Sequence, residues 1–457
     1  MNFAKARLIL SDWHPYRWLG ASYLHRLVGI CSRWRAGSWL LSHSESIGAF
    51  LIAILFTLAP FIPTSSIGIL LIAIALFWII LTLSEDRLGS GVTPIHVFVF
   101  FYWSIAVIAT ALSPIKSAAF SGLIKLSLYL FLFALCSFVL RSSRWRSIVI
   151  GVFLHVSLFV SIYGLRQQFF GARQLATWND PDSALATDGR VYSYLGNPNL
   201  LAGYLIGAIA LSVAAVFVWQ RFLPKLLALI MVFVNSSCLY FTDSRGGWIG
   251  MLAFGAAFLL LLRFWWGDRL PLFWRKWLLP MVIGGVTGAI AMGLILVEPL
   301  RLRVMSIFAW RGDSSNNFRI NVWLAAIDMI RDRPLIGIGP GNEAFNQIYP
   351  LYMRPNYTAL SAYSVFLETA IEIGLIGLSI FLGLIFTIFS CGLDRLKVMR
   401  SEQNLQAFWL IGAIAAIVGM LAHGIVDTVW YRPQINTIWW LMVAIIASSY
   451  PSFKQQR

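Results

Sequence analysis

Long apolar runs are the feature of this sequence that most restricts its fold. Residues 118–140 and 148–170 are two examples, and a helix needs about 20 mostly apolar residues to cross the core of a bilayer. The pattern extends along the chain, because 59% of its 457 residues are hydrophobic and only 12% are charged. An ordinary soluble domain carries about 25% charged residues. The sequence therefore predicts an all-α polytopic membrane protein and excludes a soluble enzyme, a secreted protein and a disordered regulator.

Charged residues and Gly or Pro positions divide the apolar runs into about twelve candidate spans within a transmembrane domain, residues 46–450. The spans are residues 46–62, 67–83, 94–112, 118–140, 148–170, 199–220, 224–241, 246–266, 277–297, 365–390, 405–430 and 435–450. The first two are joined by a short proline-containing connection, so a single tight hairpin is an alternative there. Residues 451–457 form a short tail.

Lys and Arg residues predict the orientation of the chain, because short cytoplasmic loops carry them in excess. They gather in the N-terminal segment and in alternate loops, near residues 87, 141–146, 221–225, 263–276 and 395–400. We therefore expect a cytoplasmic (inner) membrane protein with both termini in the cytoplasm. The formal net charge of +16 follows this placement, so the lipid bilayer is the expected partner and nucleic acid is not.

The N-terminal segment, residues 1–45, is basic and contains no long apolar run. A retained first span that begins near Ile47 is expected instead of a cleavable signal peptide. Within the segment, residues 24–34 place apolar side chains on one helical face, which is typical of a helix lying on an anionic leaflet. A disordered basic tail is the alternative.

The opposite, periplasmic side has two long loops, residues 166–198 and 298–364. The second contains seven arginines, although this side normally lacks positive charge; long loops are exempt from that rule. The seven are Arg301, Arg303, Arg311, Arg319, Arg331, Arg333 and Arg354. Residues 319–331 have helical apolar spacing, which predicts a short helix over the membrane or a cavity, with Arg319 at its start.

The turn that ends at Gly247 has the composition of an anion site. Ser244 can cap the helix that follows, and Gly246 and Gly247 leave its first N–H groups unobstructed. Arg245 adds a full positive charge to the positive end of the helix dipole. The alternative is that Asp243 and Arg245 only pair with each other and anchor the turn.

Neither metal ligands nor a nucleotide motif stand out. The four cysteines, Cys31, Cys136, Cys238 and Cys391, are too far apart for a CxxC-type site and are expected to pack. The glycines of residues 337–341 lack a surrounding βαβ unit, so they predict a turn and not a dinucleotide fingerprint. No cofactor is expected.

Among the ionisable residues inside or at the ends of predicted spans, the candidates are Glu368, Glu372, His423 and Asp427. Such groups are expensive in a membrane and are functional candidates by default. Glu368 and Glu372 are one helical turn apart, as are His423 and Asp427. The alternative is that they bond to neighbouring cations such as Lys125 and Arg166 and hold the bundle together.

Several motifs resemble the O-antigen ligase and polymerase superfamily of membrane glycosyltransferases. They are Ser-Arg-Gly-Gly at 244–247, Arg319 with Trp323, Gly-x-Gly-Pro-Gly-Asn at 337–342 and Glu-x-Gly-Leu-Ile-Gly at 372–377. A closer resemblance is to the cyanobacterial inorganic-carbon (bicarbonate) transporters of the IctB type. It includes residues 192–201 (YSYLGNPNLL), 314–324 (SSNNFRINVWL) and 360–364 (LSAYS).

The ligase resemblance implies an outward-facing cavity that holds a glycan on an undecaprenyl pyrophosphate carrier and transfers it to an acceptor without a metal. It implies that Arg245 and Arg319 hold the pyrophosphate. From the residues themselves, Ser244, Gly246 and His423 are further candidates for substrate binding. The ligases use a His-Asn pair at the positions that Tyr363 and Ser364 occupy here. Tyrosine titrates near pH 10 and is a poor base at neutral pH.

Three functions follow from these observations. The first is a glycan transferase, with Tyr363, Glu368 and Asp427 as candidate catalytic residues. The second is a transporter of bicarbonate or another small anion, although we find no convincing internal repeat of the kind that transporters show. The third is a non-catalytic relative that binds a lipid-linked glycan and has lost the base.

Overall fold

The computed structural model describes residues 30–35, 37–85, 91–172 and 190–450. All of the regular elements in these ranges are helices, so the predicted fold class is confirmed. Most of the N-terminal segment, including residues 24–29 of the predicted surface helix at 24–34, lies outside the described residues, as does the tail, 451–457.

Every one of the twelve predicted spans coincides with a helix of the structure. These helices are α4 (Ser44–Leu58), α5 (Thr64–Leu83), α6 (Pro94–Ala111), α7 (Lys116–Val139), α8 (Ser143–Phe170), α9 (Pro198–Val218), α10 (Phe222–Phe241), α11 (Arg245–Trp266), α12 (Leu272–Leu296), α16 (Val365–Ser401), α17 (Ala407–Val426) and α18 (Pro433–Ser449). Within the described ranges, ten are long and apolar enough to cross a membrane. The two shorter ones are α4, with 15 residues, and α18, with 17.

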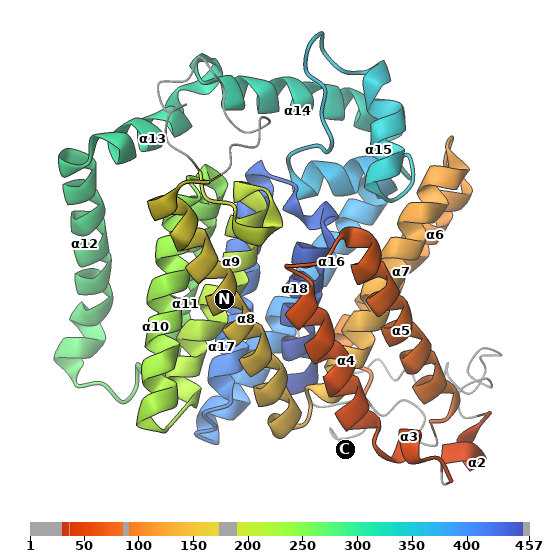
Figure 1. Ribbon diagram of the computed structural model, residues 1–457, viewed down its shortest axis with the longest axis horizontal. Coiled ribbons are helices and arrows are strands. Elements are labelled where there is room, and N and C mark those ends of the chain that lie inside the picture. The colour runs from red at the N-terminus through yellow and green to blue at the C-terminus, as the bar shows by residue number, and fades with distance from the viewer. Residues whose placement is uncertain (1–29, 36, 86–90, 173–189, 451–457) are drawn as a thin grey trace.

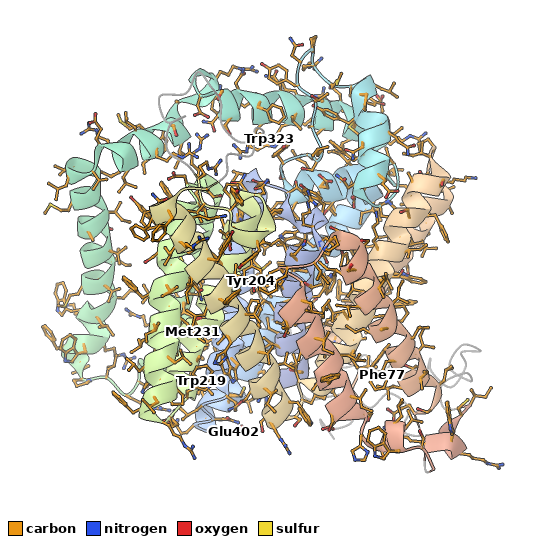
Figure 2. All side chains as sticks on the ribbon, in the orientation of Figure 1. Phe77, Tyr204, Trp219, Met231, Trp323 and Glu402 are labelled. Carbon is orange, nitrogen blue, oxygen red and sulfur yellow. The ribbon has the colours of Figure 1, made fainter. Side chains whose placement is uncertain are left out.

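The remaining elements are short or lie in connections. They are α2 (Ser32–Arg35), α3 (Trp39–Ser42), η3 (Ser193–Leu195), α13 (Glu298–Phe308), η4 (Trp310–Gly312), α14 (Ser314–Asp332), α15 (Asn342–Ile348), η5 (Tyr349–Leu351) and η6 (Val429–Tyr431). Figure 1 shows α13, α14 and α15 lying across one end of the bundle, which we call the loop end, with α2 and α3 at the other. Figure 2 places Trp323 at the loop end and Trp219 and Glu402 at the opposite end.

The centre of the bundle and its edge differ sharply in burial. In the most apolar 18-residue stretch of α9 and of α17, 78% and 72% of the residues are buried, whereas none of the corresponding stretch of α12 is. Figure 1 shows α12 standing at the edge of the bundle, joined to the loop end through α13. The packed core therefore lies around α9, α17 and α18, and α12 exposes its apolar side chains all round.

The long helix α16 is broken near its start. Ile373 and Gly374 leave helical geometry, and Gly374 has a φ of +71°, a conformation that costs glycine little. The break allows the N–H of Ile338 to donate to the carbonyl of Ile371 (2.9 Å). The glycine-rich stretch at 337–341 is thus an irregular turn docked on α16, as the sequence predicts.

The helix predicted at 319–331 is present but begins earlier. It is part of α14, which starts at Ser314 because the Asp313 carboxylate accepts a hydrogen bond from the N–H of Asn316 (2.9 Å) and caps the helix. Arg319 accordingly lies in the second turn and not at the start of the helix. The prediction that residues 320, 323, 324, 327 and 330 form its packed apolar face was wrong. Leu324 and Ile327 are each 39% exposed, and the buried residues of α14 are Val322, Ala325, Ala326 and Met329.

Candidate functional site

The first turn of α11 lies at the loop end and is capped as predicted. The Ser244 Oγ accepts a hydrogen bond from the N–H of Gly247 (3.1 Å), and Ser244 is buried. Asp243 precedes it with a φ of +51°, which turns the chain sharply from α10 into α11. The helix N-terminus, with its partial positive charge, therefore faces the region that α13 and α14 cover.

Arg245 connects this turn to the loop end. Its guanidinium donates to Asp313 Oδ1 (2.8 Å) and to the carbonyl and hydroxyl oxygens of Ser306 (3.0 and 3.1 Å). Burial alone would raise the pKa of Asp313, but the hydrogen bonds from Arg245 and Asn316 lower it below its usual range. The sequence alternative of an Asp243–Arg245 pair is not what anchors Arg245, because its carboxylate partner is Asp313.

Two further arginines converge on the same turn: Arg303, one of the seven arginines of the long loop, and Arg190, which no sequence pattern indicated. Arg303 of α13 donates to the carbonyl of Asp243 through Nη2 (2.6 Å), and Arg190 donates to the carbonyls of Thr242 (3.1 Å) and Asp243 (3.3 Å). Burial, and then the neighbouring Arg303, lowers the pKa of Arg190 to about 10. Only the position of Arg190 just before the conspicuous 192–201 stretch could have drawn attention to it.

Arg319 reaches the same region from α14. It donates to the carbonyl of Val426 (2.9 Å) and to Ser315 Oγ (2.7 Å), and its Nη2 lies 3.9 Å from Asp427 Oδ2. Its positive charge contributes to lowering the pKa values of Arg190 and Arg303, so the four arginines influence one another. We call Arg190, Arg245, Arg303 and Arg319 the arginine cluster.

Tyr363 lies beside Arg319, whose guanidinium carbon is 6.0 Å from the centre of the tyrosine ring. The carbonyl of Tyr363 accepts a hydrogen bond from Trp323 Nε1 (3.3 Å), which ties it to α14. Burial, followed by the nearby Asp427, raises the pKa of Tyr363 to about 12. This shift makes Tyr363 a weaker candidate for a base at neutral pH than free tyrosine already is.

His423 and Asp427, at the end of α17, are both buried. Neither ring nitrogen of His423 has a hydrogen-bond partner among the described residues. A Cβ atom placed on Gly246 would lie 2.7 Å from the imidazole Cδ2, so the ring packs directly against the first turn of α11. His423 thus lies behind the capped turn, next to Asp427 and Arg319.

Glu368 and Glu372 hold the loops that flank α16. Glu368 Oε2 accepts a hydrogen bond from the N–H of Ala362 (2.6 Å), and Glu372 Oε1 accepts one from the N–H of Gly341 (2.9 Å). Both carboxylates line a cavity of about 560 Å³.

The partners proposed for these carboxylates were wrong. Lys125 pairs with Glu343 (2.7 Å), and the guanidinium of Arg166 lies over the ring of Tyr163 (5.9 Å). Backbone N–H groups take the place of those cations on Glu368 and Glu372.

The structure therefore brings most of the predicted site residues to one place. Arg245, Gly246, Arg319, His423 and Asp427 are linked by direct contacts at the loop end. Ser244 caps the same turn and Tyr363 lies over Arg319. Glu368 is set apart in the cavity, but it bonds to Ala362, the residue before Tyr363. Among the described residues, no three His, Cys, Asp or Glu side chains gather closely enough to hold a metal ion.

A comparison with protein families gives one match, and it falls on this region. Residues 230–382 match the family model described as O-antigen ligase. The match runs from α10 into α16 and includes Arg245, Arg303, Arg319, Tyr363 and Glu368, whereas Arg190 and the end of α17 lie outside it. None of the curated proteins matches the chain. The chain is therefore a polytopic membrane protein, and residues 230–382 of it are similar to O-antigen ligases.

Proposed function

We propose that this protein binds a glycan carried on a polyprenyl pyrophosphate and transfers it to an acceptor hydroxyl at the periplasmic face of the cytoplasmic membrane. The observation that carries the proposal is the arginine cluster, in which four guanidinium groups surround the capped N-terminus of α11. Charge-assisted hydrogen bonds from guanidinium groups, and the positive end of a helix, both favour phosphate oxygens.

The chemistry of transfer requires such a site. The bond between the anomeric carbon and the pyrophosphate oxygen breaks, the pyrophosphate keeps the electron pair, and the acceptor oxygen bonds to the anomeric carbon while losing its proton to a base. Negative charge gathers on the departing pyrophosphate. Donors that are already oriented stabilise this charge without reorganisation. Arg245, Arg303 and Arg319 are each held by carbonyl, hydroxyl or carboxylate oxygens, which supplies that orientation.

Glu368 is the best candidate for the base. Tyr363 occupies the position of the family histidine, but its raised pKa keeps its hydroxyl protonated at neutral pH. Glu368 is 6% exposed, and besides Ala362 its carboxylate interacts with the Thr428 hydroxyl. A carboxylate oxygen that is held in place by Ala362 through its other oxygen, and faces a cavity, is suited to accept a proton.

The distribution of charge supports the proposed sidedness. The connections and helix ends at the end of the bundle opposite to the loop end carry many basic residues, among them Arg141, Arg144, Arg221, Lys225, Arg275, Lys276, Arg395 and Lys397. This is the arrangement expected of a cytoplasmic face. The loop end then faces the periplasm, with both termini in the cytoplasm. Within the family, we propose the IctB type on the strength of the sequence resemblance.

Native mass spectrometry tests the proposal on protein purified gently from its own membranes. Wild type is compared with the Arg245→Ala, Arg319→Ala double variant and with Arg354→Ala, an exposed arginine of the same loop that pairs with Asp328. We expect a polyprenyl pyrophosphate glycan on wild type and on Arg354→Ala, and none on the double variant.

A carrier lipid that all three proteins retain equally would show that the arginine cluster is not the pyrophosphate site. If none of them carries such a lipid, glycan handling is contradicted. Transport of a small anion then becomes the favoured function, and bicarbonate flux in proteoliposomes measures it directly.

A further inference from the structure

The cavity beside the arginine cluster is a separate compartment. It lies among α5, α7, α16 and α18, closed in part by residues 340–342, and its volume is about 560 Å³. None of the four arginines of the cluster lines it. Its wall adjoins the cluster through Thr428, which follows Asp427, and through Val365, which begins α16.

The wall of this cavity contains unpaired polar atoms. Trp430 Nε1 has no hydrogen-bond partner among the described residues, although Trp430 is only 9% exposed. Asn436 Oδ1, in the same wall, also has none. The Glu368 carboxylate and the Thr428 hydroxyl, in residues that are 6% and 2% exposed, interact with each other in the same wall. Buried polar groups are nearly always paired in native proteins, so two unpaired atoms beside the Glu368–Thr428 pair in one cavity indicate a ligand that bonds to this wall.

These four polar groups define the chemistry of that ligand. Glu368 and Asn436 offer acceptors, Trp430 offers a donor, and the Thr428 hydroxyl does both. A ring that carries several neighbouring hydroxyl groups supplies donors and acceptors at this spacing. The Trp430 ring packs against the Trp439 ring, with their centres 4.0 Å apart. This contact holds the Trp430 N–H group in position.

The charged residues of the cavity indicate which kind of hydroxyl-bearing ring it binds. Glu368 and Glu372 both face it, whereas the charge of Lys125 is matched by Glu343 at 2.7 Å. Arg432 is exposed and lies over the ring of Tyr431 (5.2 Å). An ammonium group beside the two carboxylates gains a charge-assisted hydrogen bond, and a further carboxylate would be repelled.

We propose that this cavity is a binding site for a neutral or amino-bearing sugar. Glu368, Thr428, Trp430 and Asn436 hold the sugar through its hydroxyl or ammonium groups, and the cavity excludes acidic sugars. This inference rests on the proposed function, in which the bound sugar is the acceptor.

Saturation-transfer NMR on the full-length protein in nanodiscs tests the site with three probes: methyl glucoside, methyl glucosaminide and methyl glucuronate. We expect the glucosaminide to bind most tightly, by about five-fold over the glucoside, and the glucuronate to bind most weakly. Glu368→Gln should remove the preference for the amine and weaken its binding about ten-fold.

Matched variants separate recognition from folding. Thr428→Val and Trp430→Phe remove one hydrogen-bonding atom each and keep the shape of the wall, so both should weaken all neutral sugars. Asp394→Asn, an exposed carboxylate near the far end of α16, should change nothing. Binding that is unaffected by all three cavity variants, no sugar binding by wild type, or a glucuronate that binds best would each overturn the proposal.

The same samples keep this inference distinct from the proposed function. Arg245→Ala should lose the carrier lipid in native mass spectrometry and still bind the glucosaminide, since Arg245 does not line the cavity. Sugar binding without any carrier lipid would support the cavity site and contradict the transfer. A carrier lipid without sugar binding would support the pyrophosphate site and contradict the sugar site in the cavity.

Discussion

The arginine cluster and the neighbouring cavity are both polar and both lie near the loop end, but they satisfy their polar groups in opposite ways. In the cluster, Arg245 and Arg319 already donate to oxygen atoms of the protein at 2.7 to 3.1 Å. In the cavity, Trp430 Nε1 and Asn436 Oδ1 lack partners among the described residues. The cluster is thus a preformed electrostatic surface, whereas the cavity needs a ligand to complete its hydrogen bonds.

This difference separates two tasks that a transferase must perform. A charged leaving group is best stabilised by donors that do not move, and a small neutral substrate is best selected by polar groups that would otherwise stay unpaired. The residues between the two regions, Tyr363 and Asp427, contact the cluster through Arg319. Substitutions in each region should therefore have different signatures.

The largest effect is expected in the cluster. Arg245→Ala removes a guanidinium from the α11 turn and leaves the partly buried Asp313 without its partner, so kcat/KM for glycan transfer should fall about 1000-fold. Transfer from a purified carrier lipid in proteoliposomes measures this, with Arg354→Ala as the control. A fall of less than ten-fold would remove Arg245 from the site.

A change in the cavity should lower turnover without loss of the carrier. Glu368→Gln keeps an acceptor for the N–H of Ala362 but cannot take a proton, so kcat should fall about 100-fold. Retention of the carrier lipid should match wild type, and Asp394→Asn should behave as wild type in both measurements. Loss of the carrier lipid in Glu368→Gln would show that the cavity also binds the carrier, so that the two regions do not have separate tasks.

The boundary between the two regions is tested through Gly246. Gly246→Ala would bring a Cβ to 2.7 Å from the His423 ring and 3.1 Å from Val426 Cγ2, which should destabilise the protein by about 1 to 3 kcal/mol. Gly284→Ala in α12 is the matched control, since nothing lies within 4 Å of its Cβ. Thermal unfolding in detergent compares them. Equal melting temperatures would show that the α11 turn and α17 are not tightly packed.

The smallest effect is expected at Tyr363. Because burial raises its pKa to about 12, the hydroxyl stays protonated at every lower pH and no Tyr363 anion forms near neutrality. Tyr363→Phe keeps the ring against Phe318 and Arg319, so the transfer rate should fall less than about three-fold and its profile between about pH 6 and 9 should not shift. A 100-fold loss would make Tyr363, and not Glu368, the base.

The sequence predicted the helices well because hydropathy reports directly on the cost of placing backbone and charge in lipid. All twelve predicted spans are helices, and the cap at Ser244 forms as its residue type predicts. It predicted partners poorly, because a pairing such as Arg245–Asp313 or Lys125–Glu343 joins residues 68 and 218 positions apart. Local spacing contains no information on such contacts.

The candidate site was predicted in part. Motifs indicated Arg245 and Arg319, which α14 brings beside α11 and α17, but Arg190 and Arg303 carry no motif and were found only through their bonds to the turn before α11. The cavity could not be predicted at all, because its wall joins α5, α7, α16 and α18.

By itself the sequence determined that the chain is a bundle of membrane-crossing helices, since burial in lipid depends on local composition. It also predicted the capped start of α11 with Arg245 beside it, since a capping residue acts within a few positions. Only the tertiary structure decided which arginines share one site and which polar atoms remain unpaired. Both depend on packing between distant helices, where the free energy of each polar group is set by the neighbour it meets.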